Sequence, residues 1–158
     1  MPQRPVEVER KWLVEELPAL AKHESKAVLQ GYIAIGTDGT EVRLRQTDGQ
    51  FFQTVKSAGG LVRDEIEIDL TKGQFEALWR ATAGRRLKKT RYTWRWEEKK
   101  VEIDVYHGSL AGLIVAEVEF TSANASARFA PPPWFGPEVT EDKRYKNVTL
   151  ALHGRPPQ

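Results

Sequence analysis

Glu7, Glu9 and Lys11 occupy alternate positions near the start of the chain and are separated by Val8 and Arg10. In an extended strand, side chains two residues apart point to the same face and lie about 7 Å apart. Two carboxylates at that separation suit a hard divalent cation, and a lysine one step further along could hold an anion on that cation. For an isolated triplet, the alternative is the solvated face of an amphipathic strand.

The rest of the chain repeats this alternation, with charged residues at every second position and apolar residues between them. The charges are also grouped by sign. The acidic groups are Glu65, Glu67 and Asp69, then Glu102 and Asp104, then Glu117 and Glu119, and the basic ones are Arg43 and Arg45, Lys56, and Lys89 and Arg91. Like charges on one strand face repel each other unless an opposite charge lies between them. Metal ions would fill that role on the acidic strands, and a polyanion would fill it on the basic ones.

This combination of charges indicates a phosphate-rich ligand. The guanidinium fork of arginine matches phosphate oxygens bidentately, and lysine adds point charge. Magnesium at phosphoryl-transfer sites is usually held by one or two carboxylates and shared with substrate phosphates. Six or more cations favour a triphosphate or polyphosphate over a monophosphate. The sequence has no P-loop and no glycine-rich nucleotide motif.

Composition narrows the class of protein. We expect one domain over residues 1–158, with a flexible tail at residues 154–158. The net charge of +2 gives no basic field of the kind that nucleic-acid-binding proteins carry. The chain has no cysteine, no apolar run long enough to cross a membrane and no apolar leader at its start. We therefore expect a cytoplasmic protein with no nucleic-acid or membrane partner.

The pattern predicts a mainly β (α+β) protein. Strands are expected at residues 5–14, 26–35, 40–48, 51–57, 61–70, 85–96, 99–107 and 112–121, and helices at 71–82, 121–129 and 141–153. We expect Thr71 and Gln74 to form a capping box, Thr140 to cap the last helix, and Glu41 and Asp69 to lie at strand ends in solvent. The aromatic residues of the proline-rich segment 130–137 are expected to anchor it. Alternation alone does not show which face of the sheet is inside, so a sandwich with a charged exterior stays open.

The order of the motifs resembles the CYTH superfamily, the triphosphate tunnel metalloenzymes. The matching segments are the Glu7-x-Glu9-x-Lys11 triplet, 42–45 (VRLR), 55–56 (VK), 65–68 (EIEI), 89–92 (KTRY), 101–105 (VEIDV), 116–120 (AEVEF) and 139–147 (VTEDKRYKN), and they cover essentially the whole chain. The resemblance implies an eight-stranded antiparallel β-barrel that forms a tunnel, with the charged faces inward and a few peripheral helices. The apolar faces would then be covered by the helices or by a second copy in a homodimer.

The same resemblance, together with the chemistry of the side chains, implies a role for each charged residue. Glu7, Glu9, Glu117 and Glu119 would hold Mg²⁺ or Mn²⁺. Phosphate would bind to Lys11, Arg43, Arg45, Lys56, Lys89 and Arg91, and Arg144 with its neighbours would close the tunnel. Lys11, Glu102 and Asp104 are the candidate catalytic residues. Glu65 and Glu67 would serve a second metal or, equally, form ion pairs that hold the arginines extended.

The expected activity is metal-dependent hydrolysis of a triphosphate. Gln30-Gly31-Tyr32 resembles the short bacterial members associated with inorganic triphosphate, which favours tripolyphosphate as the small-molecule substrate. The alternatives are an organic triphosphate such as thiamine triphosphate or a nucleotide, adenylate cyclase activity, and a module that binds polyphosphate without turnover. A pure binder has little use for many inward carboxylates, because they repel the ligand unless metal is present.

Overall fold

The computed structural model describes residues 8–17, 19, 23–57 and 64–157. Its strands are β1 (Val8–Val14), β2 (Glu24–Ile35), β3 (Glu41–Thr47), β4 (Gln50–Lys56), β5 (Glu65–Leu70), β6 (Arg86–Trp96), β7 (Lys99–Tyr106), β8 (Ile114–Phe120) and β9 (Phe135–Glu138). They form one antiparallel sheet in the order β5-β4-β3-β2-β6-β7-β8-β1-β9. The eight expected strands are all present. The ninth, β9, lies in the segment that the sequence predicted as a loop.

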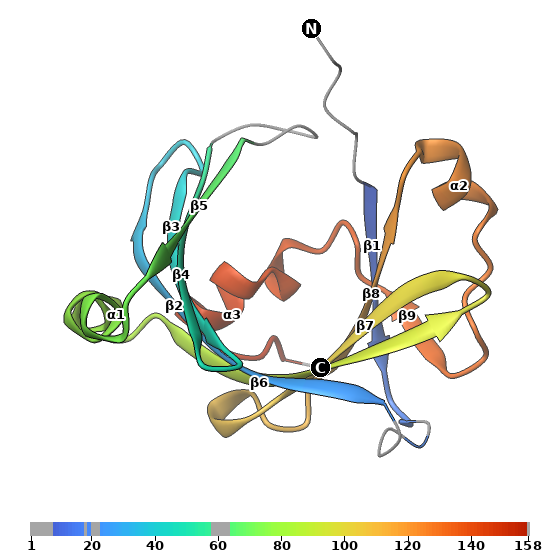
Figure 1. Ribbon diagram of the computed structural model, residues 1–158. Coiled ribbons are helices and arrows are strands. Elements are labelled where there is room, and N and C mark those ends of the chain that lie inside the picture. The colour runs from blue at the N-terminus through green and yellow to red at the C-terminus, as the bar shows by residue number, and fades with distance from the viewer. Residues whose placement is uncertain (1–7, 18, 20–22, 58–63, 158) are drawn as a thin grey trace, which may run out of the picture.

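The sheet curves around a central space, as Figure 1 shows. Neighbouring strands pair mostly through hairpins, and the pairing of β2 with β6 joins two hairpin groups that are distant in sequence. Within the described residues, no ladder of hydrogen bonds connects β5 to β1 or β9, so the barrel is open along that side. Charged side chains from β1 and from β3 to β8 line this central space, which confirms the tunnel arrangement expected from the resemblance.

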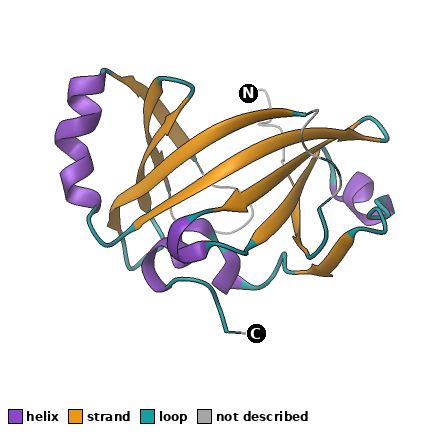
Figure 2. Cartoon of the chain, turned by 90° about the horizontal axis from the view of Figure 1, so that it is seen from below, coloured by secondary structure: helices purple, strands orange, loops and turns teal. Residues whose placement is uncertain are grey.

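The helices lie at the margins and at one end of the sheet (Figure 2). They are α1 (Lys72–Trp79), α2 (Ala123–Arg128) and α3 (Asn147–His153), with 3-10 turns at Arg80–Thr82, Gly108–Leu110 and Lys143–Tyr145. The capping box of α1 is confirmed. The backbone N–H of Gln74 donates to the Thr71 hydroxyl at 3.1 Å, and the backbone N–H of Thr71 donates to the side-chain oxygen of Gln74 at 2.9 Å. Among the described residues, no helix has the length and apolar character needed to cross a membrane.

The helix expected at residues 141–153 is divided in two. The side chain of Asp142 caps a 3-10 turn at Lys143–Tyr145, Lys146 is extended, and α3 starts only at Asn147. Thr140 does not cap it; its hydroxyl accepts a hydrogen bond from the Lys11 amide at 3.0 Å and donates one to Glu138 at 2.6 Å. The break turns α3 into the concave side of the sheet, where Figure 1 shows it.

The apolar strand faces are covered unevenly. On the outer face of β1, β7 and β8, a core that includes Trp12, Ile103 and Phe120 packs under α2 and the proline-rich segment. The rings of Trp12 and Phe135 lie 4.9 Å apart, which confirms that aromatic residues anchor this segment. On β5, by contrast, Ile66 is 63% exposed and Ile68 is 51% exposed.

Gly31 allows α1 and the turn after it to lie close to the outer face of β2. A Cβ atom at this position would come within 2.8 Å of both Thr82 and Trp79. Its neighbours Gln30 and Tyr32 project from the opposite face of the strand, into the concave side. The Gln30-Gly31-Tyr32 segment therefore combines close packing outside with polar groups inside.

The hairpin between β6 and β7 contains a strained turn. Glu97 and Glu98 both have positive φ, +46° and +64°, between the paired residues Trp96 and Lys99. A two-residue turn of this kind favours Asn-Gly. We expect the double change Glu97→Asn and Glu98→Gly to raise the free energy of unfolding by about 1 kcal/mol. Glutamate is sterically unfavourable at positive φ, whereas asparagine and glycine adopt this conformation more readily.

Urea denaturation followed by tryptophan fluorescence measures this change. The matched control is the double change Glu97→Ala and Glu98→Ala, which removes both charges but leaves the backbone conformation unfavourable. Equal stabilisation by both pairs would contradict a conformational origin.

Candidate functional site: a charged tunnel

The concave side of the sheet holds a cavity of about 360 Å³. The residues around it are almost all polar or charged: Glu9, Lys11, Tyr32, Glu41, Arg43, Arg45, Lys56, Glu65, Arg91, Glu102, Glu117, Glu119, Thr140, Lys146, Asn147 and Val148. They come from β1 to β8, from the segment between β9 and α3, which supplies Thr140 and Lys146, and from the start of α3. We call this cavity the tunnel.

Ten of the predicted site residues line the tunnel, namely Glu9, Lys11, Arg43, Arg45, Lys56, Glu65, Arg91, Glu102, Glu117 and Glu119. Glu7 lies outside the described residues. Within the described part of the chain, the structure places four other predicted residues away from the tunnel lining: Glu67, Lys89, Asp104 and Arg144. The predicted roles of these four need revision.

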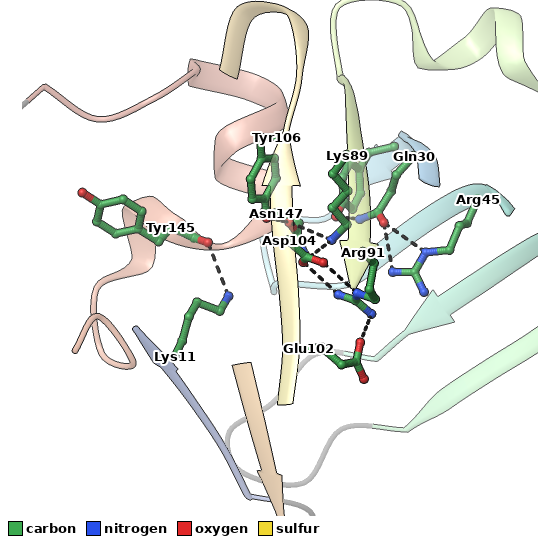
Figure 3. Close-up of polar contacts among 11 residues, drawn as sticks. Lys11, Gln30, Arg45, Lys89, Arg91, Glu102, Asp104, Tyr106, Tyr145 and Asn147 are labelled. Atoms are coloured by element: carbon green, nitrogen blue, oxygen red, sulfur yellow. Dashed lines mark hydrogen bonds and ion pairs between the residues drawn. The ribbon is translucent and has the colours of Figure 1, made fainter. Parts of the chain in front are cut away.

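Lys89 and Asp104 form a buried ion pair behind the lining. Lys89 is fully buried, and its Nζ donates to Asp104 at 2.9 Å. Arg91 donates to the two oxygens of the same carboxylate, from Nε at 2.8 Å and from Nη2 at 2.9 Å (Figure 3). Burial alone would raise the pKa of Asp104, but Lys89 and Arg91 outweigh it and hold this pKa well below its ordinary value. These contacts orient Arg91 through Asp104, and Lys89 pairs with the same carboxylate.

Arg91 connects this buried pair to the tunnel. It forms a second ion pair, to Glu102, which lines the tunnel. Burial opposes the charge on Arg91, yet the hydrogen bonds and charges of Asp104 and Glu102 raise its pKa above the ordinary value. Held from two sides, this guanidinium has one fixed orientation and stays charged.

The start of α3 closes one end of the tunnel. The Asn147 side-chain oxygen accepts hydrogen bonds from the Tyr106 hydroxyl at 2.6 Å and from Lys89 at 3.5 Å. Below it, Leu150 packs against Leu87 in an apolar cluster of the inner face. Lys11 donates to the backbone oxygen of Tyr145 at 3.4 Å, just before α3 (Figure 3). The polar residues therefore line the space, and the apolar part of α3 seals its floor.

The opposite wall carries Arg43, Lys56 and Glu65. Glu65 lies 3.8 Å from Arg43 and 3.9 Å from Lys56, at the long end of the range for ion pairs. Burial and the neighbouring Arg43 lower the pKa of Lys56. Glu67 instead accepts a hydrogen bond from Thr54 at 2.8 Å. Of the two roles predicted for this pair of glutamates, the contacts of Glu65 fit the ion-pair role.

Arg144 is directed away from the tunnel lining. Its guanidinium is exposed and binds Asp142, two residues earlier, at 2.7 to 3.2 Å. The nearby cation that does line the tunnel is Lys146, on the extended residue between the 3-10 turn and α3. The predicted closing role therefore fits Lys146 better than Arg144.

Three carboxylates gather on the paired strands β1 and β8. Glu9 lies opposite Glu119, and Lys11 lies opposite Glu117. Burial, the charge of Glu117 and a hydrogen bond to it, and the charge of Glu119 together raise the pKa of Glu9 to about 7. Carboxylates that repel each other in this way gain from a cation between them.

The carboxylates of this cluster are of the ligand type that divalent metal ions bind. Glu9, Glu117 and Glu119 offer the oxygen ligands that hard cations prefer. Within the described residues, however, no three acidic, histidine or cysteine side chains already surround a common metal position. The ligand set therefore needs further oxygens, and phosphate or water can supply them.

Sequence reasoning missed several lining residues. Glu41, expected in solvent, is 9% exposed and lines the tunnel. Tyr32, Thr140, Asn147 and Val148 also line it without having been predicted to do so. For Glu41 and Tyr32 the signal was present, because they share strand faces with Arg43 and Gln30. For Thr140 and the start of α3, no periodic pattern could have given the break in the helix.

Comparison with known proteins identifies the family. A model of the CYTH domain matches residues 6–131. The chain belongs to the CYTH family. A CYTH relative from Nitrosomonas europaea, named inorganic triphosphatase, is 51% identical over 147 residues, which span 92% of this chain and 97% of the relative. A protein of the same name from Acetivibrio thermocellus is 34% identical, with 92% of each chain covered.

The CYTH fold of this chain also matches a solved structure. The crystal structure of the inorganic triphosphatase NE1496 is similar with a TM-score of 0.76 and 48% sequence identity, and the match covers 92% of this chain and 94% of that one. The structure and the sequence comparison therefore agree on the family.

Proposed function

We propose that this CYTH protein is a divalent-metal-dependent enzyme that hydrolyses inorganic triphosphate to pyrophosphate and phosphate. The observation that carries the proposal is the tunnel, a cavity of about 360 Å³ that is lined both by Arg43, Arg45 and Arg91 and by the carboxylates of Glu9 and Glu117. Relatives at 51% and 34% identity bear the name of this activity. The tunnel lining carries both basic and acidic side chains, which fits a ligand that is a polyanion and also binds a metal ion.

The lining favours an inorganic substrate over an organic triphosphate. Tyr32 is the single aromatic residue among the described lining residues, and it is itself almost fully buried. Proteins usually bind a nucleotide base or a thiamine ring with stacked aromatic or apolar groups. The described lining offers no such platform, and it offers many cations for phosphate oxygens.

The basic residues of the tunnel bind and orient the phosphate chain. Arg43, Arg45 and Lys56 lie on the wall formed by β3 and β4, and Arg91 lies on β6. Arginines fixed in this way bind the chain in one orientation and stabilise charge on the phosphate oxygens during transfer. Lys11 lies on the carboxylate side, where it can bind a phosphate oxygen beside the acidic cluster.

Glu9, Glu117 and Glu119 would hold the divalent ion, with Glu7 as a further candidate. When bound, the ion neutralises phosphate oxygens and makes the phosphorus more susceptible to attack. In the reaction, water attacks the terminal phosphorus, the bond from that phosphorus to the bridging oxygen breaks, and pyrophosphate leaves with the electron pair. Glu102 is the candidate for orienting this water, because it lines the tunnel beside Arg91.

Phosphate release from tripolyphosphate, ATP and thiamine triphosphate tests the proposal. We expect release from tripolyphosphate with Mg²⁺ or Mn²⁺ and none with EDTA. Release from an organic triphosphate alone would move the assignment to that substrate. Tight binding without any release would make the protein a binding module.

Other parts of the sequence prediction stay proposals. They are the choice of Mg²⁺ or Mn²⁺ as the metal, the homodimer, the cytoplasmic location, the single domain over residues 1–158 and the flexible tail at residues 154–158. The exposed Ile66 and Ile68 on β5 support a contact with a second copy. The absence of cysteine supports the cytoplasm.

A further inference from the structure

The cations of the tunnel differ in what holds them. Arg91 is bound by two carboxylates, Asp104 and Glu102. Arg43 and Lys56 both lie within 4 Å of Glu65. For Arg45, by contrast, no ion pair with a carboxylate occurs within the described residues. Its guanidinium is bound by a neutral group, the side-chain amide of Gln30.

Two donors of Arg45 share one oxygen of Gln30 in a part-buried contact. Gln30 is fully buried, and its Oε1 accepts from Arg45 Nε at 3.0 Å and from Nη2 at 2.9 Å (Figure 3). The two residues lie directly opposite each other on β2 and β3. Nε and Nη2 are also the atoms with which Arg91 binds the two oxygens of Asp104, but in Arg45 both donate to a single oxygen of a neutral group.

A second contact fixes the orientation of the amide. Gln30 Nε2 donates to the Tyr32 hydroxyl at 2.8 Å. Exchanging the oxygen and nitrogen of the amide would place two donors against the donors of Arg45, so the network admits one orientation. Gln30 is therefore a rigid acceptor that directs the guanidinium of Arg45.

The electrostatic surroundings compensate the charge of Arg45 only in part, because Asp104, a carboxylate that favours this charge, is itself paired with Lys89 and Arg91. Burial, then the positive charges of Arg43 and Arg91, lower the pKa of Arg45 to about 10. A phosphate chain in the tunnel would supply the missing negative charge. A carboxylate in place of the Gln30 amide would supply it permanently and would compete with the phosphate.

We propose that Gln30 is a positioning residue that directs Arg45 into the tunnel while leaving the arginine charge free to bind the substrate phosphates. This role rests on the proposed hydrolysis of triphosphate. If Gln30 has this role, tight binding of triphosphate requires that the Gln30 side chain be uncharged as well as hydrogen-bonded to Arg45.

The test uses Gln30→Glu, which keeps an acceptor of the same length and adds one negative charge. The matched control is Gln46→Glu, which adds the same charge next to Arg45 in sequence but on the outer face of β3. We expect Gln30→Glu to raise KM for tripolyphosphate about tenfold or more, to change kcat less than threefold, and to maintain or raise the thermal midpoint of the metal-free protein. Gln46→Glu should leave all three values close to those of the unmodified protein.

A third variant, Gln30→Met, removes the acceptor without adding charge. We expect it to raise KM less than Gln30→Glu and to lower the thermal midpoint, because Arg45 loses its buried partner. An unchanged KM in Gln30→Glu, or an equal rise in Gln46→Glu, would overturn the proposal. So would a fall in kcat with KM unchanged.

Binding of tripolyphosphate in EDTA, measured by calorimetry, separates this proposal from the proposed function. Weaker binding by Gln30→Glu than by Gln46→Glu supports the role of Gln30 even if the unmodified protein shows no turnover. Absence of turnover in the unmodified protein would overturn the hydrolase assignment alone. Equal binding by the two variants would overturn the role of Gln30 alone.

Discussion

Replacing Glu9 with glutamine is expected to reduce metal-dependent hydrolysis of tripolyphosphate by roughly 100-fold or more, the scale on which one preorganised electrostatic group contributes to catalysis. The change removes one negative charge from the cluster with Glu117 and Glu119 while keeping the shape of the side chain. Phosphate release at saturating Mg²⁺ or Mn²⁺ measures the effect. Activity that stays near that of the unmodified protein would remove Glu9 from the metal site.

The same variant should be more stable without metal, and the sign of this effect follows from the pKa. The pKa of Glu9 rises from 4.5 to about 7 on folding, so ionising Glu9 costs stability in the folded protein. That cost is fully present above pH 7 and disappears below pH 4.5. Glu9→Gln should therefore raise the thermal midpoint of the metal-free protein at pH 8 and leave it nearly unchanged at pH 4. The exposed change Glu76→Gln is the matched control, with no expected gain.

Asp104→Leu is expected to lower the free energy of unfolding by about 3–5 kcal/mol, because it leaves Lys89 buried without its carboxylate partner. Urea denaturation followed by tryptophan fluorescence measures the loss. Asp69→Asn, at an exposed position on β5, is the matched control and should change stability by less than about 1 kcal/mol. The double variant Lys89→Met with Asp104→Leu should recover much of the loss. A double variant as unstable as the single one would contradict the unpaired charge as the cause.

The contribution of Asp104 also depends on pH in a defined direction. Its pKa lies below the ordinary value of 3.8 in the folded protein, so the carboxylate stabilises the fold fully above pH 3.8. That stabilisation is lost as the pH falls through the folded-state pKa. The difference in stability between the unmodified protein and Asp104→Leu should therefore narrow as the pH falls below 3.8.

The strands and the sign of each strand face could be predicted from the sequence. Alternation of Glu65 with Ile66, or of Glu117 with Val118, depends only on the two-residue period of an extended chain. The capping box at Thr71 and the turn at Asp48-Gly49 are also local, and both are present in the structure. The order of the charged motifs along the chain was enough to indicate the CYTH family.

The burial of each side chain on the concave face could not be predicted in this way. Lys89 and Arg91 share one face of β6, yet Lys89 is fully buried and Arg91 reaches the tunnel. The difference arises from α3, which fills one end of the concave side through Leu150 and Asn147. The two-residue alternation shows which face of a strand a residue is on. Whether that residue is buried or reaches solvent depends on packing against a helix that is distant in the sequence.

The pairing of charges likewise depended on tertiary structure. Gln30 has no charge and no periodic signal that separates it from other polar residues, but the register of β2 against β3 places it opposite Arg45. Arg144 carries the right charge, but the break before α3 directs it to Asp142. The sequence by itself determined which strand faces carry charge and which sign each bears. Only the tertiary structure decided which of those charges are neutralised by buried partners and which are left for a ligand, because this depends on contacts between residues far apart in the chain.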